Sequence, residues 1–343
     1  MKKPARFWEK LPEDKVRCVL CPRFCIIAPG KVGFCRARKN EGGELYTLTY
    51  GVVTSMAVDP IEKKPLYHFW PGSDIFSIGT VGCNFACRHC QNWTISQGTI
   101  ETVGHEEVSP ERVVELAKRY RSPGIAFTYS EPVVWHEFSY DTAKLAHREG
   151  LYTVYVTNGY MSIDAWKELR PYLDAANVDV KAFSDRFYRE ICGVPKIDAV
   201  LETCEWMVKN GVHLETTYLI IPRENDDPEE IRKFCRWEVE KLGAEIPTHF
   251  SQFYPQYKMT DRSPTPVETL ERAVKIAKEE GLNYVYIGNV PGHDADNTYC
   301  PKCGELLIKR YGFDVTRYSL KDKRCPKCGA KISIIGEYKS GSR

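Results

Sequence analysis

The chain has 343 residues, of which 43% are hydrophobic and 27% are charged, enough to build a large core with small additions. It has no run of about 18 apolar residues and no apolar signal segment at its start, which argues against an integral membrane protein and predicts a cytoplasmic location. The net charge of +2 is uneven, because residues 1–45 and 296–343 each carry 11 basic and 5 acidic residues and the middle is acidic. Solvated surface charge explains this pattern, and binding of RNA or of an acidic protein is the alternative.

The first group of cysteines lies near the N-terminus, at Cys18, Cys21, Cys25 and Cys35. Fourteen cysteines in a cytoplasmic chain indicate metal sites before disulfides. This spacing fits neither a regular zinc ribbon nor a common ferredoxin pattern, so structural zinc and an auxiliary iron–sulfur cluster both remain open. A cluster could carry electrons, whereas zinc would only fold a basic arm. We expect residues 1–45 to form a small Cys-rich metal-binding module.

From about residue 75 to 293, short β-branched or aromatic runs alternate with amphipathic helical segments, which is typical of a parallel α/β sheet. The first helix is expected to begin at Ser109-Pro110, a favourable cap. About six β/α units emerge, too few for a complete eightfold barrel. The predicted fold is therefore α/β, a partial (β/α)6 TIM-like barrel over residues 46–295. Its expected strands are 75–82, 125–129, 152–157, 177–181, 214–221, 248–253 and 284–287.

The second group of cysteines, Cys83-x3-Cys87-x2-Cys90, directly follows the first predicted strand. Three thiolates can hold three irons of a cubane and leave the fourth iron without a protein ligand. A structural zinc ion would need a fourth ligand, for which His89 is the nearby candidate. Segment 59–68, rich in charged and aromatic residues, precedes this strand and is expected near the loop, where packing of the barrel mouth is its simpler role.

Polar residues follow the later strands, with Glu131, Asn158 and Lys181 after the second, third and fourth. Pro222-Arg223 follows the fifth. Active sites of α/β sheets and barrels lie beyond the carboxyl ends of their strands. The pattern therefore predicts one site surrounded by successive strands.

The third group of cysteines forms two knuckles near the C-terminus, each followed by glycine. Such knuckles wrap a tetrahedral metal, for which zinc is favoured and a rubredoxin-like iron is the alternative. We expect residues 296–343 to form a zinc-ribbon or rubredoxin-like module with three short strands. The ligands are expected to be Cys300, Cys303, Cys325 and Cys328. The remaining cysteines, Cys192, Cys204 and Cys235, are expected to be small buried residues on helices.

The cysteine loop resembles the signature of the radical S-adenosylmethionine (SAM) superfamily. With RCVLCPRFCIIAPGKVGFCRAR, FTYSEPVVW and TTYLIIPREND, it resembles the radical SAM proteins of the AmmeMemoRadiSam system, relatives of pyruvate formate-lyase activating enzyme. The resemblance implies that Cys83, Cys87 and Cys90 bind a [4Fe-4S] cluster. It also implies that SAM chelates the open iron and is cleaved reductively to methionine and a 5′-deoxyadenosyl radical.

Further roles are implied by the same resemblance. His89 takes the place of an aromatic residue near the adenine, Glu131 contacts the SAM amino group, and Asn158 lies near the ribose. Asp179 and Lys181 face the active site. A capped helix start is the alternative for Glu131, and a structural ion pair is the alternative for Asp179 and Lys181.

The substrate is not readable from the sequence, and three functions compete. The first is a radical SAM enzyme acting on a small molecule, the second is an activase that abstracts hydrogen from a glycine of a partner protein, and the third is RNA modification or RNA binding. A non-enzymatic electron-transfer protein would not need an open iron. Expected partners are an electron donor such as ferredoxin or flavodoxin and, by resemblance, Memo-like and AMMECR-like proteins.

Overall fold

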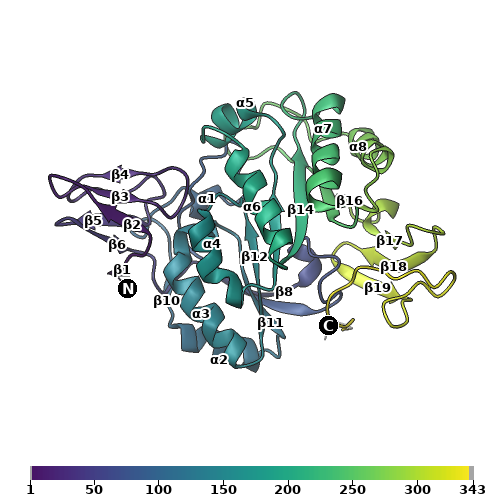
Figure 1. Cartoon of the computed structure of the whole chain (residues 1–343), viewed down its shortest axis with the longest axis horizontal. Helices are drawn as coiled ribbons and strands as arrows, with labels where there is room; N and C mark the ends of the chain where they lie inside the picture. Colours follow the sequence, from purple (N-terminus) through teal and green to yellow (C-terminus); the bar gives the residue numbers. More distant parts are fainter. Residues whose placement is uncertain (1, 340–343) are drawn as a thin grey trace.

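The computed structural model describes residues 2–339 and is built around an eight-stranded sheet with the order β16-β15-β14-β13-β12-β11-β9-β8 (Figure 1). Seven strands pair in parallel. All seven overlap the predicted strands, so the alternation of the sequence identified the parallel sheet. They are β9 (Asp74–Gly79), β11 (Gly124–Phe127), β12 (Tyr152–Thr157), β13 (Ala175–Asp179), β14 (His213–Ile220), β15 (Pro247–Gln252) and β16 (Tyr284–Gly288).

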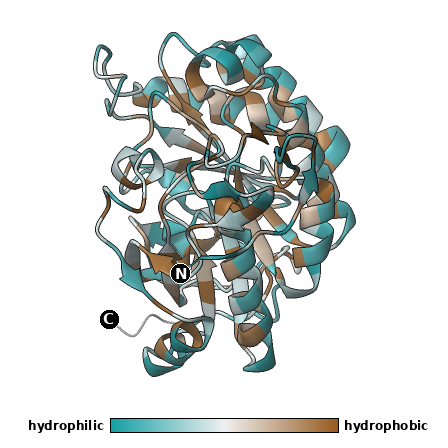
Figure 2. Cartoon of the chain, turned by 90° about the vertical axis from the view of Figure 1, so that its left-hand side faces the viewer, coloured by the Kyte–Doolittle hydropathy of each residue, from teal (hydrophilic) through white to brown (hydrophobic). Residues whose placement is uncertain are grey.

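Helices connect the parallel strands and pack against the sheet with their apolar faces. Ser109 caps the first long helix by accepting a hydrogen bond from the backbone N–H of Arg112, as its sequence predicts. Figure 2 shows hydrophilic residues over the outward surfaces of peripheral helices and hydrophobic residues turned toward the sheet. The main helices are α2 (Pro110–Arg119), α3 (His136–Arg148), α4 (Ile163–Leu169), α6 (Asp198–Lys209), α7 (Pro228–Trp237) and α8 (Val267–Glu279).

The barrel is open, because β16 and β8 (Ser55–Pro60) are the two edges of the sheet. β8 pairs antiparallel with β9, from Ser55 opposite Gly79 to Pro60 opposite Asp74. It was absent from the expected strands, since SMAVDP lacks the alternation of a strand and ends in proline. The partial barrel is confirmed, with this edge strand as an addition.

The N-terminal cysteines lie in a module of two small antiparallel sheets with the orders β1-β6-β5 and β2-β3-β4 (Figure 1). Short strands of this kind bury little apolar surface by themselves, so contacts with the barrel and metal ligands are expected to contribute to their stability. The strands are β1 (Lys3–Pro4), β2 (Trp8–Lys10), β3 (Val16–Cys18), β4 (Ile26–Ile27), β5 (Arg38–Glu41) and β6 (Glu44–Thr47).

The C-terminal module contains the expected three strands, β17 (Thr298–Tyr299), β18 (Leu306–Tyr311) and β19 (Asp314–Tyr318). It is attached to the barrel through buried polar contacts. Tyr286 of β16 lies 2.9 Å from the hydroxyl of Thr298, and the guanidinium of Arg310 donates a hydrogen bond of 3.0 Å to the carbonyl of Tyr67. The Arg310 guanidinium also lies 3.7 Å from the fully buried Glu62. The module therefore packs against the β16 edge and the segment that precedes β9.

The remaining short elements connect these parts, and no helix within residues 2–339 is long and apolar enough to cross a membrane. Cys192, Cys204 and Cys235 are completely buried in helical segments, as predicted. The connecting elements are η1 (Ile61–Lys63), β7 (Val52–Val53), α1 (Trp93–Ser96), β10 (Glu106–Glu107), η2 (Pro132–Trp135), η3 (Arg170–Tyr172), α5 (Asp185–Phe187), η4 (Tyr188–Cys192), η5 (Glu238–Leu242) and η6 (Asp294–Asp296).

Candidate functional site

A cavity of about 430 Å³ lies at the carboxyl ends of the parallel strands. Its walls come from the loops after β9, β11, β12 and β13 and from residues of β14 and β15. The eight residues that the sequence assigns to the cluster and to SAM line this one cavity, although they span almost 100 positions of the chain. They are Cys83, Cys87, His89, Cys90, Glu131, Asn158, Asp179 and Lys181.

The backbone and a nearby hydroxyl hold the thiols of the cysteine loop. The backbone N–H of Phe85 donates a hydrogen bond of 3.3 Å to the Sγ of Cys83, and the Sγ of Cys90 lies 3.2 Å from the Oγ of Ser96 in α1. Such donors lower the pKa of a thiol, but burial outweighs them here and raises the pKa of both Cys83 and Cys90. All three thiols of the loop border the open cavity, which fits a cubane that leaves one iron accessible.

A fourth cysteine lies behind this loop and was not recognised from the sequence. Cys192 is fully buried at the end of η4, and its backbone carbonyl accepts a hydrogen bond of 2.9 Å from the N–H of Ala86. A hydrogen bond from the Cys192 thiol lowers the pKa of Cys87. A lone cysteine in a helical segment carries no sequence signal for this contact, since the chain brings the two residues together only through η4.

Glu131 is 3% exposed and is fixed by three hydrogen bonds. One carboxylate oxygen accepts from the hydroxyl of Thr157 at 2.6 Å and from the N–H of Val133 at 3.1 Å, and the other accepts from the N–H of Asn158 at 2.8 Å. Burial raises the pKa of Glu131 to about 7 despite these donors. The side chain both caps η2 and faces the cavity, so the two roles considered from the sequence coexist.

Two polar atoms in the cavity wall have no partner among the described residues. They are the Nδ1 of His89 and the Oγ of Ser130, both shielded from solvent. Burial and the charge of Lys181 lower the pKa of His89 to about 3, so the ring is neutral at physiological pH. Buried polar groups are normally hydrogen-bonded, and these two atoms therefore fit a cavity that receives a polar ligand.

Charged residues line the cavity on two sides. Lys181 lies 3.0 Å from Asp179, and although burial alone would lower the pKa of Lys181, the Asp179 charge raises it well above its usual value. On the other side the buried Lys64 ammonium lies 2.6 Å from Asp59. Burial lowers the pKa of Lys64 to about 8. The ion pair considered as an alternative role for Asp179 and Lys181 is present, and both of its members face the cavity.

The loop after β16 adds Asn289 to the wall, a residue near the end of the last predicted strand. One wall residue comes from a part of the chain that the sequence did not connect with the site: Phe313, 44% exposed, lies in the turn between β18 and β19 of the C-terminal module. Pro222 and Arg223, expected at the site because they follow the fifth strand, are not among its lining residues. The C-terminal module therefore reaches the cavity with an aromatic side chain.

The four C-terminal thiols are close enough to bind one ion. The sulfur of Cys300 lies 3.6 Å from that of Cys328, and the sulfur of Cys303 lies 3.7 Å from that of Cys325. Four sulfurs bound to one zinc ion at about 2.3 Å are about 3.8 Å apart. The predicted set thus has the geometry of a tetrahedral metal site, with all four positions supplied by protein.

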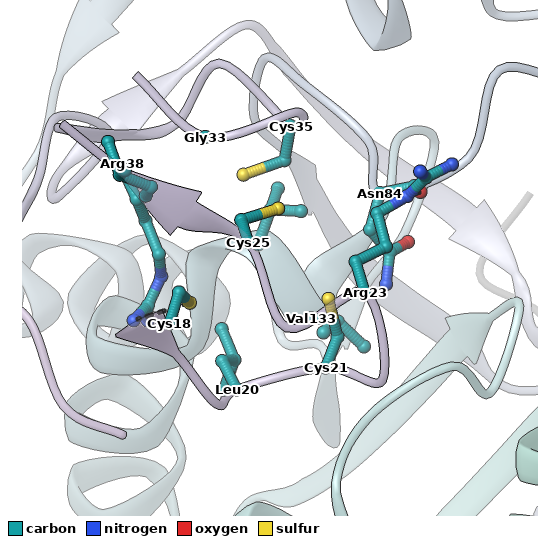
Figure 3. A pocket seen from close by; sticks show the side chains of 12 residues that line it. Cys18, Leu20, Cys21, Arg23, Cys25, Gly33, Cys35, Arg38, Asn84 and Val133 are labelled. Atoms are coloured by element: carbon teal, nitrogen blue, oxygen red, sulfur yellow. Dashed lines mark hydrogen bonds between the residues drawn. The ribbon is translucent and has the colours of Figure 1, made fainter. Parts of the chain in front are cut away.

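The N-terminal thiols surround a second, small cavity (Figure 3). Its volume is about 20 Å³, enough for a water molecule. Burial raises the pKa of Cys21 to about 12 and that of Cys35 to about 11. No disulfide links the cysteines of the described residues. All four members of the predicted N-terminal set line the cavity: Cys18, Cys21, Cys25 and Cys35.

Comparison with known proteins gives consistent matches. The family model described as the radical SAM superfamily matches residues 77–235. The uncharacterized protein MJ0808 of Methanocaldococcus jannaschii is 50% identical over 333 residues, covering 96% of this chain and 99% of that protein. Pyruvate formate-lyase 1-activating enzyme of Escherichia coli K12 is 25% identical over 227 residues, covering 60% of this chain and 89% of the enzyme. A solved radical SAM methyltransferase from Sphaerobacter thermophilus aligns with a TM-score of 0.49 at 15% identity, over 62% of this chain and 66% of that chain.

Proposed function

We propose, for a chain that belongs to the radical SAM superfamily and is related to the pyruvate formate-lyase activating enzymes, that Cys83, Cys87 and Cys90 bind the [4Fe-4S] cluster. SAM would bind in the adjoining cavity. The observation that carries this assignment is the convergence of three thiols, a buried carboxylate and two unpartnered polar atoms on one cavity at the strand ends.

The residues of the cavity have separable roles in this proposal. The three cysteines of the loop would hold the cluster through their thiolates, and the cluster, once reduced, would supply the electron for cleavage of SAM to methionine and a 5′-deoxyadenosyl radical. Glu131 accepts a hydrogen bond from the ammonium group of SAM. Its carboxylate is already held in place by Thr157 and Asn158, so little order is lost when the ligand binds. The neutral ring of His89 offers Nδ1 to the adenine. Asn158, whose side-chain amide lies 3.8 Å from the Cys83 thiol and whose backbone N–H donates to Glu131, borders the ribose.

Asp179 and Lys181 are proposed to orient the ligand from the opposite wall. Their ion pair places a carboxylate and an ammonium side by side at the cavity surface. Such a pair can donate to the carboxylate of SAM and accept from its hydroxyl groups without a net change of charge in the wall. Lys63 and Lys64 both pair with Asp59, so this group adds about one net positive charge on the β8 side, which favours a ligand or substrate with anionic groups.

A partner protein is the substrate class that we favour. The relatives in E. coli and Clostridium pasteurianum are pyruvate formate-lyase activating enzymes, and activases act on another protein. An open sheet and the exposed Phe313 at the cavity are compatible with entry of a peptide segment. The resemblance to the AmmeMemoRadiSam system, with Memo-like and AMMECR-like partners, remains a prediction about the identity of that protein.

The C-terminal thiols are proposed to bind structural zinc. Their sulfur spacing fits a single tetrahedral ion, and the protein fills all four positions. The metal would stabilise the module that presents Phe313 to the cavity. A chain depleted of zinc should therefore lose order in this module before the barrel unfolds.

The experiment is anaerobic incubation of iron- and sulfide-reconstituted protein with SAM and dithionite, with 5′-deoxyadenosine and methionine measured by mass spectrometry. Wild-type protein should form both, and Cys87→Ala should form neither. Cys204→Ala, a buried cysteine of α6 outside the cavity, is the matched control and should behave as wild type. Equal product formation by the Cys87→Ala variant would refute the assignment.

A further inference from the structure

The N-terminal thiols are arranged differently from the C-terminal ones. The four C-terminal sulfurs all lie within 4.8 Å of one another. Among residues 2–339, no other set of three or more thiol, imidazole or carboxylate ligand atoms is packed as closely. No three of the N-terminal thiols meet that spacing. A single zinc ion would require about 3.8 Å between every pair. In a cubane each thiolate binds a different iron, so its four sulfurs surround a wider space.

The wall of the space between the N-terminal thiols contains one buried guanidinium, that of Arg38, which is paired with the buried Glu137. In Figure 3 the sulfurs of Cys25 and Cys35 point into the same cavity, with Arg38 beside Cys18. Arg38 is 1% exposed and its Nη1 lies 4.0 Å from the sulfur of Cys18. Its Nε has no partner among the described residues. A cubane held by four thiolates is anionic, and this guanidinium and its free N–H are suited to it.

The same cavity shares a wall with the central site. Asn84 lines the N-terminal cavity, while its neighbour Cys83 lines the central one. Gly82 lies so close to the module that a Cβ there would be 2.6 Å from the carbonyl oxygen of Cys35. In the same way, Val133 lines the N-terminal cavity and Glu131, two residues earlier, lines the central one. The two sites are therefore separated by a single layer of backbone.

Polar contacts also join the module to the central cysteine loop. Arg36 donates a hydrogen bond of 3.0 Å to the carbonyl of Ser96, whose hydroxyl contacts the sulfur of Cys90. The guanidinium of Arg23 donates to the carbonyls of Asn84 and Gly193. These contacts fix the distance between the two sites, as rapid electron transfer between redox centres requires.

We propose that Cys18, Cys21, Cys25 and Cys35 bind an auxiliary [4Fe-4S] cluster that relays single electrons to the cluster at the central site. The relay rests on the proposed function, whereas the auxiliary cluster itself does not. In each transfer the auxiliary cluster takes one electron from a one-electron donor protein and is reduced from the 2+ to the 1+ state. It returns to 2+ when it passes that electron to the central cluster, so no proton or atom moves between the two sites.

The metal is tested on a full-length variant in which Cys83, Cys87 and Cys90 are all replaced by alanine, which leaves the N-terminal site as the place for a second cluster. After anaerobic reconstitution this variant should contain about four irons and four sulfides per chain and show an EPR signal on reduction that SAM does not alter. Zinc in place of iron would overturn the inference, provided that circular dichroism shows a folded chain. If the triple variant bound as much iron as the wild type, Cys83, Cys87 and Cys90 would not be cluster ligands, and the proposed function would be contradicted instead.

The placement is tested by EPR of the fully reduced wild type. Two clusters separated by one layer of backbone should interact magnetically. The spectrum of the fully reduced wild type should therefore be broader than the sum of the spectra of the triple variant and of Cys18→Ser/Cys25→Ser, and a spectrum equal to that sum would refute the proximity. Cys204→Ala, which changes a buried cysteine of α6 outside both cavities, controls for a general effect of cysteine loss.

The relay is tested by comparing two reductants, reduced flavodoxin and dithionite, in SAM cleavage. The ratio of the flavodoxin-driven rate to the dithionite-driven rate should fall at least tenfold in Cys18→Ser/Cys25→Ser, because a protein donor cannot enter the central cavity as dithionite can. An unchanged ratio would refute the relay. The iron content of the variant shows whether the auxiliary cluster has been removed.

Discussion

Replacing Glu131 with glutamine tests how the cavity recognises SAM. Both carboxylate oxygens accept hydrogen bonds, from Thr157 and Val133 on one side and from the backbone N–H of Asn158 on the other. Glutamine has nearly the same shape but only one acceptor oxygen. Whichever way its amide is turned, an NH2 group faces a donor that it cannot satisfy.

The expected loss of SAM affinity follows from the hydrogen bond to the ligand ammonium. A hydrogen bond to a charged group contributes about 1.5–3 kcal/mol, and about 1.4 kcal/mol corresponds to a tenfold change of Kd. Glu131→Gln should therefore weaken SAM binding by about 10- to 150-fold. The unpaired buried donor should also lower the free energy of unfolding by about 1–3 kcal/mol.

Anaerobic calorimetric titration of reconstituted protein with SAM measures the affinity, and iron analysis shows that the cluster is retained. The matched control is Glu238→Gln, because Glu238 is also a buried glutamate that accepts two hydroxyl hydrogen bonds but lies outside the cavity. Its SAM affinity should equal that of the wild type. A Kd for Glu131→Gln within twofold of the wild type, with iron retained, would refute the role of Glu131.

Three further predictions concern stability. Burial raises the pKa of Glu238 to about 8, so the folded chain keeps a proton that the unfolded chain releases above about pH 4.3. The free energy of unfolding, measured in urea, should therefore fall as the pH rises from 5 to 8, by up to about 1.4 kcal/mol per pH unit from this residue. Glu238→Gln should remove that part of the slope, and an unchanged slope would contradict the protonated state. Arg310→Met leaves the buried Glu62 without its cation and should cost about 3–5 kcal/mol, most of which the double variant Glu62→Gln/Arg310→Met should recover in the same assay. Cys300→Ser/Cys303→Ser should lose one zinc per chain by elemental analysis and lower the melting temperature, whereas full zinc retention would exclude these ligands.

The parallel sheet could be predicted because its signal is local. Most of the seven strands contain a short run of apolar or β-branched residues that is buried on both faces, and the helices between them are amphipathic. β8 could not be predicted, since it is stabilised by its pairing with β9 and its sequence is that of an ordinary loop. Edge strands depend on their partner for hydrogen bonds and carry a weaker pattern of their own.

The residues of the central cavity were also accessible from sequence, because the topology of a parallel sheet brings all strand ends to one edge. That rule anticipated Glu131, Asn158 and Lys181 as neighbours. It could not find Cys192 or Phe313. The first reaches the cysteine loop through the path of η4, and the second belongs to a module that folds back from the end of the chain.

The sequence by itself determined that three groups of cysteines exist and that the central one leaves a ligand position open, because spacing along the chain is enough to recognise a chelating loop. It did not distinguish zinc from iron and sulfide at the N-terminal group. That choice depends on the distances between thiols and on what lies behind them, and both are set by how two small sheets pack against the barrel. The tertiary structure alone places that group one layer of backbone from the central site, where electron relay becomes its proposed role.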